Sequence, residues 1–174
     1  MKRVIVIGGG ASGLMAAIMA ARGGAKVILA EKNRQAGKKL LVTGNGRCNF
    51  TNRRQEPSCY RSEYPQLTEK ILNAFSMEDT VAFFEELGIL VKDRNGYLYP
   101  ASGQASSIAD VLRLEVQRLA GQHRIKEAYN TEVLAVEKEN GLFRVRTEGW
   151  TYEGEAVILA CGSEAAPKTG CTGD

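Results

Sequence analysis

The sequence has few of the residues on which metal centres and disulfide scaffolds depend. Its 174 residues include four cysteines and one histidine, and no two cysteines are spaced as Cys-x-x-Cys. Zinc sites and disulfide frameworks need clustered cysteine or histidine ligands, so the sequence predicts neither, and no bound metal. Reduced thiols are typical of the cytoplasm, where we expect the protein to reside. His123 has no accompanying carboxylate or nucleophile pattern, so we expect a surface residue there rather than a general acid or base.

Long apolar runs and a strong charge of one sign are also missing. No segment approaches the run of about 18 apolar residues that a membrane span needs. The basic start Met1–Arg3 is typical of a secretory signal, but Gly8–Gly10 interrupts the apolar helix that a signal requires. The formal charge is +3, too near balance to attract nucleic acid or an anionic membrane by its bulk field. The pairs Lys38–Lys39 and Arg53–Arg54 are too sparse for the RNA-binding surface of a tRNA-modifying enzyme.

Glycine is plentiful, with 19 residues, and it is concentrated near the amino terminus. Val4–Ile7 is a short apolar run of the kind that forms a buried parallel strand. Gly8–Gly13 follows it directly and satisfies G-x-G-x-x-G, and Leu14–Arg22 is rich in good helix formers. Lys26–Ala30 is a second buried strand, closed by Glu31. This order of strand, motif, helix, strand and acid predicts a unit that binds a dinucleotide; the alternative is a glycine-rich turn without a ligand.

Each part of this motif has a physical role in holding a dinucleotide. Gly8 allows the tight turn, Gly10 lets the backbone approach a pyrophosphate, and Gly13 lets the helix pack closely on the sheet. The free N–H groups at the helix start, including those of Ala11 and Ser12, face the phosphates. Glu31 lies 18 residues after Gly13, where a carboxylate accepts the ribose hydroxyls and disfavours the 2′-phosphate of NADP.

The segment after Glu31 bears on which dinucleotide is bound. A simple NAD domain proceeds to another helix and strand, whereas residues 32–52 form a polar loop interrupted by glycines. Such a backbone can approach a flat ring system with few side chains in the way. Lys38, Lys39 and Arg47 are candidates for neutralising a phosphate or a reduced flavin, with simple solvation as the alternative. Cys48 has no partner cysteine four residues away, so we expect a packing role there rather than a redox role.

Several of these segments resemble one family of bacterial FAD flavoproteins, which includes aminoacetone oxidase and the bile-acid 3-dehydro-Δ4,6-reductase. The resemblance rests on Gly8–Gly13, Glu31–Lys32, Gly37–Leu40, Thr43–Asn52, Gly96–Ser102 and Ala156–Gly162. It implies FAD as cofactor, a small-molecule substrate, and hydride or electron-pair transfer through the flavin. It also implies that the backbone of Val133 meets the adenine. The complete set of expected cofactor-binding residues is Gly8, Gly10, Ala11, Ser12, Gly13, Glu31, Lys32, Lys38, Lys39, Thr43, Gly44, Asn45, Gly46, Arg47, Cys48, Asn49, Val133, Ala160, Cys161 and Gly162.

The remaining sequence predicts the rest of an α/β fold. Pro65 opens a helix with one buried apolar face, Ser76 and Asp79 cap a second helix, and Asn95–Gly96 marks a hairpin turn. Short strands with turns between them fill residues 125–153 and lead into a further buried strand at 156–160. We therefore expect a Rossmann-like parallel sheet with a three-stranded β-meander crossover of the glutathione-reductase-like kind. Residues 53–104 are expected to form an insertion of helices and a hairpin.

Two hypotheses about function follow. In the first, residues 1–174 are the amino-terminal part of an FAD-binding domain, incomplete at the carboxyl terminus, in an FAD-dependent oxidoreductase of unknown substrate. In the second, the chain is a non-catalytic truncated fragment that binds FAD weakly or not at all. Family members continue beyond the position of Asp174 and supply a last sheet strand from later sequence. We accordingly expect an open sheet edge through which the chain self-associates. The sequence indicates no catalytic side chain.

Overall fold

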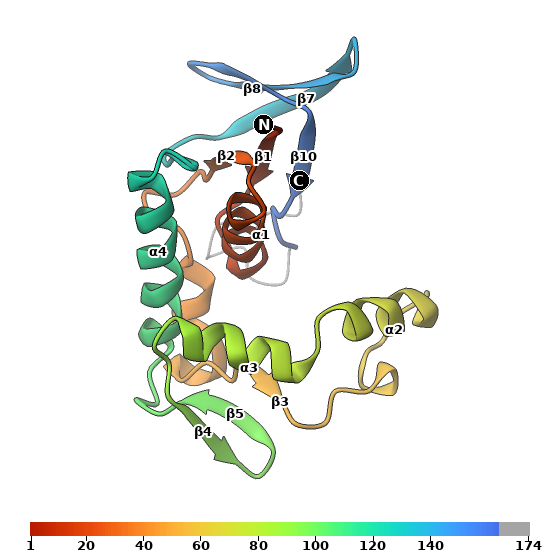
Figure 1. Ribbon diagram of the computed structural model, residues 1–174, viewed down its shortest axis with the longest axis vertical. Coiled ribbons are helices and arrows are strands. Elements are labelled where there is room, and N and C mark those ends of the chain that lie inside the picture. The colour runs from red at the N-terminus through yellow and green to blue at the C-terminus, as the bar shows by residue number, and fades with distance from the viewer. Residues whose placement is uncertain (164–174) are drawn as a thin grey trace. The chain divides into compact units, whose positions relative to one another are not determined.

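The computed structural model describes residues 1–163, and the chain divides into two compact units (Figure 1). The first comprises Met1–Leu40 and the chain from Leu112 onward, and the second comprises Leu41–Val111. The predicted insertion at residues 53–104 lies within the second unit; its boundaries stay a prediction.

A parallel four-stranded sheet forms the centre of the first unit. Its order is β10 (Ala156–Leu159), β1 (Arg3–Ile7), β2 (Lys26–Ala30) and β6 (Ile125–Ala128). All three strand pairs are parallel, with Ile7 opposite both Ala30 and Leu159. The strands are short and rich in β-branched residues, as expected of a sheet covered on both faces. The predicted Rossmann-like α/β fold is confirmed.

Helix α1 (Ala11–Arg22) connects β1 to β2 and packs against the sheet. Its buried residues are Gly13, Leu14, Ala17, Ile18 and Ala21, which recur at the three- and four-residue spacing of one helix face. Gly24, with φ of +90°, follows the helix and directs the chain back into β2. The long helix α4 (Ala105–Gly121) leads into β6 and spans the boundary between the two units.

A three-stranded antiparallel meander connects β6 to β10 (Figure 1). It consists of β7 (Val133–Glu139), β8 (Leu142–Thr147) and β9 (Thr151–Gly154). Ile5 and Ile7 of β1 form a buried cluster with Val145 of β8. The side chains of β1 that point away from α1 are thus covered by the meander, because successive strand residues face opposite sides. The predicted three-stranded crossover is confirmed.

The second unit contains a small antiparallel sheet and two helices. The sheet has the order β3 (Thr51–Asn52), β5 (Tyr97–Pro100) and β4 (Val91–Arg94). Asn95 and Gly96 form the predicted hairpin turn with φ of 56° and 85°. Helix α3 (Met77–Glu86) has the predicted capping box, in which Ser76 Oγ accepts from Asp79 N and Asp79 Oδ2 accepts from Ser76 N. A short 3-10 turn, η2 (Pro57–Cys59), precedes the helices.

Helix α2 (Pro65–Ala74) begins at Pro65 as predicted, but the expectation of a buried face is wrong. None of its residues is buried, and Leu67 and Ile71 are 55% and 58% exposed. The periodic spacing of apolar residues identifies an amphipathic helix correctly. The spacing does not indicate which other element would cover the apolar face, and no element of residues 1–163 covers it.

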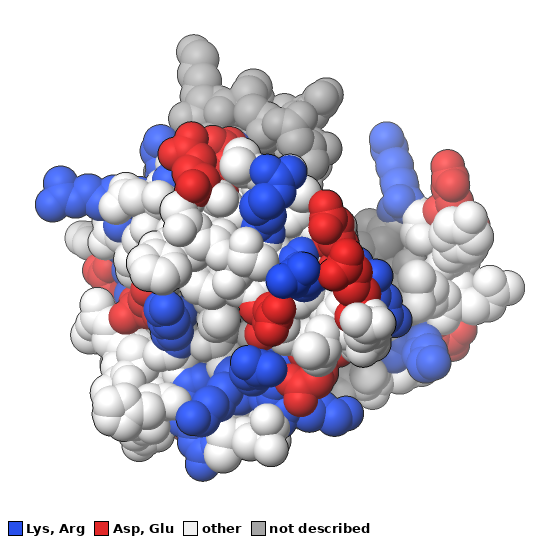
Figure 2. Space-filling model, turned by 90° about the horizontal axis from the view of Figure 1, so that it is seen from above, with Lys and Arg blue, Asp and Glu red and all other residues white. Residues whose placement is uncertain are grey.

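Three properties of the described residues concern possible partners. No helix within residues 1–163 has the length and apolar character to cross a membrane. In the same part of the chain, no three histidine, cysteine or acidic side chains are grouped as metal ligands would be. On the face drawn in Figure 2, Lys and Arg side chains alternate with Asp and Glu side chains, so both signs are mixed across it.

Candidate functional site

The glycine-rich turn lies at the carboxyl end of β1, between the ends of β2 and β10. Gly8 N donates to Ala30 O at 2.8 Å, and Ala160 N donates to Ile7 O at 2.8 Å. A Cβ on Gly8, whose φ is +102°, would lie 2.3 Å from Ala160 O. A Cβ on Gly13 would lie 1.8 Å from Gly8 O. Glycine is therefore required at both positions by backbone contact, in agreement with the tight turn and close packing expected from the sequence.

Among residues 1–163, the start of α1 is open on the side of Gly10. Within this part of the chain, a Cβ built on Gly10 meets no atom within 4 Å, and no side chain caps the helix. Gly10 O accepts the first helical hydrogen bond, from Leu14 N, at 2.9 Å. The N–H groups of Ala11, Ser12 and Gly13 precede this bond and have no partner within the helix. With no acidic residue in the first turn, this helix end offers positive potential and N–H donors to an anion.

Glu31 brings its carboxylate against the glycine-rich turn. The residue is 7% exposed, and its Oε2 accepts from Gly9 N at 2.6 Å. Its Oε1 accepts from Asn33 N at 2.7 Å and from Asn33 Nδ2 at 2.5 Å. A carboxylate has about four acceptor sites, so these three bonds leave capacity for a ligand hydroxyl. Glu31 is thus fixed beside the turn, where the sequence places a ribose-binding acid.

The loop after Glu31 is fixed to the same turn. Gly37 N donates to Gly9 O at 2.6 Å, and Ala36 is fully buried. Arg113 of α4 reaches this loop and donates from Nε to Ala36 O at 2.9 Å. Sequence reasoning missed Ala36 and Arg113. Arg113 lies 77 residues from its partner, and no local pattern connects the two.

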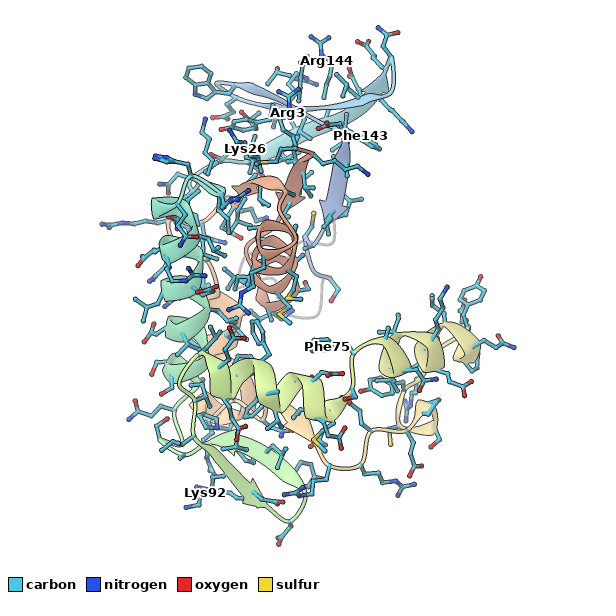
Figure 3. The ribbon with its side chains drawn as sticks, in the orientation of Figure 1. Arg3, Lys26, Phe75, Lys92, Phe143 and Arg144 are labelled. Carbon is cyan, nitrogen blue, oxygen red and sulfur yellow. The ribbon has the colours of Figure 1, made fainter. Side chains whose placement is uncertain are left out.

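The lysines of this loop differ in exposure. Lys32 and Lys38 are exposed, whereas Lys39 is half-buried. Arg3 and Lys26 begin β1 and β2, so they lie at the end of the sheet opposite the glycine-rich turn (Figure 3). Among the predicted site residues of this unit, Lys32, Lys38 and Lys39 carry positive side-chain charge, and Arg113 adds a further cation at the loop.

Two further predicted segments approach the turn from the carboxyl-terminal part of the first unit. The chain leaves β10 through Ala160, Cys161 and Gly162, and Cys161 Sγ lies 3.8 Å from Ile7 O. Gly162 has φ of +86°, which turns the chain after the strand. The start of β7 is also near Glu31, because Thr131 N donates to Glu31 O at 2.9 Å, two residues before Val133. Val133 itself is half-buried on the meander cluster.

The second predicted loop, Thr43–Asn49, lies in the other unit. Gly44, Asn45 and Gly46 have φ of 53°, 52° and 78°, and Cys48 has φ of 55°. Cys48 is buried, as expected of a packing residue, and its N–H donates to Thr43 O at 3.2 Å. Asn49 Nδ2 bonds Thr51 O at 2.7 Å and Leu98 O at 3.0 Å, which ties the loop to β3 and β5. Arg47 is exposed. A flavin-binding role for this loop stays a prediction.

These features define the class of the protein. A parallel sheet whose first strand enters a helix through a glycine-rich turn, with an acid at the end of the second strand, is a Rossmann-type domain. The chain belongs to the HI0933-like family, because the family model described as the HI0933-like protein Rossmann domain matches residues 2–174. The expected family is thereby confirmed; its predicted link to aminoacetone oxidase stays a prediction.

Similar proteins include two curated enzymes and two solved structures. The chain is 41% identical to the 3-dehydro-bile acid delta(4,6)-reductase of Clostridium scindens, over 99% of this chain and 42% of the relative. It is 31% identical to the ribosomal RNA dihydrouridine synthase of Escherichia coli, over 97% of this chain and 41% of the relative. Similar folds occur in THI4 of Thermovibrio ammonificans (TM-score 0.56, 16% identity, 95% of this chain and 59% of that one). A similar fold also occurs in CtdE, solved with FAD and a substrate (TM-score 0.55, 19% identity, 97% of this chain and 40% of that one). The chain spans about two fifths of the length of the curated relatives.

Proposed function

We propose that this chain is the amino-terminal part of the FAD domain of a flavin-dependent reductase. The observation that carries the proposal is the buried Glu31 carboxylate, which accepts a hydrogen bond from Gly9 N beside a turn whose Gly10 meets no other atom of residues 1–163 within 4 Å of its Cβ position. Family membership, and the presence of FAD in CtdE, support FAD as the cofactor. A turn blocked by side chains, or a carboxylate directed away from it, would have opposed this function.

The first unit has the groups needed for the ADP half of FAD. The N–H donors of Ala11, Ser12 and Gly13 suit the pyrophosphate, and the remaining acceptor capacity of Glu31 suits the adenosine ribose. Gly10 leaves room for the phosphates to approach the backbone. The buried environment of Glu31 favours hydrogen bonding to sugar hydroxyls over contact with a 2′-phosphate, since a second negative charge there would be repelled.

For the flavin half, we assign Lys38, Lys39 and Ala160–Gly162 of the first unit; the role of Thr43–Asn49 in the second unit is proposed from the sequence alone. Lysine or arginine charge near the ring would stabilise the reduced, anionic form. When bound, FAD supplies hydride or electron-pair transfer at its isoalloxazine ring. The protein's own contribution in this proposal is to bind and orient the ring. No side chain is assigned a proton-transfer role.

We propose that the substrate of the whole protein is a small molecule with a carbon–carbon double bond to be reduced. Support comes from the names of both relatives, which describe reductions: of a bile acid in one case and of uridine in ribosomal RNA in the other. The higher identity to the bile-acid enzyme favours a small molecule. The mixed charge in Figure 2 also offers no extensive basic surface for RNA on that face.

The experiment that tests the cofactor proposal is the visible spectrum of the purified chain, followed by titration with FAD. We expect flavin absorbance, or saturable binding of added FAD with a change in flavin fluorescence. A colourless protein that takes up no FAD would contradict the proposal and favour the non-catalytic fragment. For the substrate, a protein spanning the full length of its relatives would be reduced under anaerobic conditions and mixed with an unsaturated steroid ketone or with ribosomal RNA. If ribosomal RNA reoxidised the reduced flavin and the steroid ketone did not, the small-molecule assignment would be contradicted.

A further inference from the structure

We propose that Arg113 is a positioning residue for the dinucleotide site, holding the loop after β2 against the glycine-rich turn. The inference rests on the proposed function, because the turn is taken as the binding site for the ADP half of FAD. Arg113 belongs to α4, which neither contains nor adjoins the nucleotide motif in sequence. Its contact nevertheless reaches the site through one intervening residue.

The connection consists of two short hydrogen bonds in series. Arg113 Nε donates to Ala36 O at 2.9 Å, and the next residue, Gly37, donates from N to Gly9 O at 2.6 Å. Ala36 is fully buried, and its Cβ lies 2.9 Å from the place a Cβ of Gly9 would occupy. The peptide between Ala36 and Gly37 is planar, so a donor on Ala36 O also fixes the direction of Gly37 N–H toward Gly9.

The site is closely packed around this guanidinium. Its buried Nη2 lies 3.6 Å from the place a Cβ of Gly37 would occupy, and Gly37 has φ of +76°. Glycine adopts this left-handed region readily, so the loop passes the guanidinium without backbone strain. Gly9 connects the loop to Glu31, because its O accepts from Gly37 N and its N donates to Glu31 Oε2. Displacement of the loop would therefore be transmitted to the carboxylate that is assigned to the ribose.

Arginine suits this role better than a neutral side chain. A guanidinium presents several donors in a rigid plane. The half-buried Tyr129 hydroxyl donates to Glu127 Oε1 at 2.6 Å. Burial and the acids Glu127 and Glu31 raise the pKa of Tyr129, whereas the positive charge of Arg113 opposes this rise.

The test compares Arg113→Met, Arg113→Lys and a matched control, Arg118→Met, in the full 174-residue chain. Arg118 is on the same helix and pairs with Glu115. FAD affinity is measured by fluorescence titration, ADP affinity by competition, and stability by melting without ligand. We expect Arg113→Met to weaken FAD and ADP equally, by roughly tenfold, the value of one charge-assisted hydrogen bond. Arg113→Lys should recover most of this loss, and Arg118→Met should change affinity less than about threefold despite a lower melting temperature.

Each outcome decides for or against the proposal. Wild-type affinity in Arg113→Met, an equal loss in Arg118→Met, or no recovery in Arg113→Lys would overturn it. If Arg113→Met does not fold, Arg113→Gln removes the charge while keeping a polar end, and the same tenfold loss is expected. Failure of the wild-type chain to bind FAD would instead contradict the proposed function, so the two failures are distinguishable.

Discussion

At the scale of single residues, glycine has two different uses in the turn after β1. Gly8 and Gly13 are required because backbone oxygens occupy the space of a side chain, at 2.3 Å and 1.8 Å from the respective Cβ positions. Gly10, by contrast, has no neighbour from the described part of the chain within 4 Å of its Cβ position. The first use concerns the folded chain itself, whereas the second leaves room for a ligand. Substitution by alanine should therefore separate stability from binding.

We expect Gly13→Ala to destabilise the chain by roughly 2–3 kcal/mol, because the helix must move away from Gly8 O. Gly10→Ala should cost only about 0.5–1 kcal/mol, the loss for alanine at an N-cap. It should nevertheless weaken FAD binding at least tenfold, since the methyl group occupies the space assigned to the pyrophosphate. Urea unfolding and FAD titration of both variants measure the two effects. Equal FAD affinity in Gly10→Ala and wild type would contradict the assignment.

Glu31→Gln should weaken FAD binding by roughly 10- to 100-fold, because charge-assisted hydrogen bonds contribute about 1.5–3 kcal/mol. The amide also turns one acceptor into a donor that faces the N–H groups of Gly9 and Asn33. A lower melting temperature should accompany the loss. The control is Glu155→Gln, which removes an exposed carboxylate beside Arg3, at the opposite end of the sheet. If both variants bound FAD as the wild type does, the ribose role of Glu31 would be wrong.

At this scale the sequence predicted the residues that belong to one local motif, although the contacts of Gly8 reach Ala30 and Ala160. The motif spacing predicted Gly8, Gly13 and Glu31, because strand, turn and helix geometry fixes their relative positions. Asn33 was missed, although its place two residues after Glu31 and its short side chain suit a local hydrogen bond. Arg113 was out of reach, since only the folded arrangement of α4 brings it to Ala36.

At the scale of elements, a buried carboxylate joins the two helices of the first unit. Glu115 of α4 is 5% exposed and accepts from Arg22 Nε of α1 at 2.9 Å. It also accepts from Arg118 Nε at 2.6 Å and Nη2 at 2.8 Å. The bond from Arg118, followed by that from Arg22, lowers the pKa of Glu115 below its usual value of 4.5, against the opposing effect of burial. The helices are thus linked by an ion pair whose strength depends on pH.

We predict that Glu115→Gln destabilises the chain by about 1–3 kcal/mol at pH 7, less than for a fully buried pair because both arginines are partly exposed. The folded pKa lies below the unfolded one, so this stabilisation is complete above about pH 4.5 and is lost as pH falls through the folded pKa. Urea unfolding at pH 7 and near pH 3 should show the difference between variant and wild type shrinking. As a control, Glu153→Gln removes an exposed partner of Arg144 on the meander (Figure 3) and should cost less than about 1 kcal/mol. A constant difference across pH would refute the role of the charge.

The elements themselves were more predictable than their packing. Local signals sufficed for the capped start of α3 and for the Asn95–Gly96 hairpin, because each is decided within about four residues. The apolar spacing of α2 also predicted a helix correctly. Whether that face is covered depends on elements elsewhere, and here Leu67 and Ile71 remain more than half exposed. Periodicity predicts an apolar face, not the surface that buries it.

At the scale of the whole molecule, β10 forms one of the two edges of the parallel sheet that have no partner strand among residues 1–163; β6 forms the other. β10 pairs with β1 on one side, and no strand among residues 1–163 pairs with its other side. Leu159, the last residue of β10, is 71% exposed. An unpaired strand edge presents backbone N–H and C=O groups that can add a strand from another chain. Self-association through this edge was expected from the sequence and remains a proposal.

We predict that the chain associates in a concentration-dependent manner and that Leu159→Lys suppresses it, because lysine on an edge strand opposes pairing with a second strand. Sedimentation velocity over a hundredfold concentration range, on the order of 1–100 μM, would show the mass rising toward that of two chains in the wild type only. The matched control is Leu114→Lys, which changes a leucine on α4 that is 61% exposed and distant in sequence from the edge. It should associate as the wild type does. A wild type that stays monomeric, or a Leu159→Lys variant that associates equally, would show that this edge is not the interface.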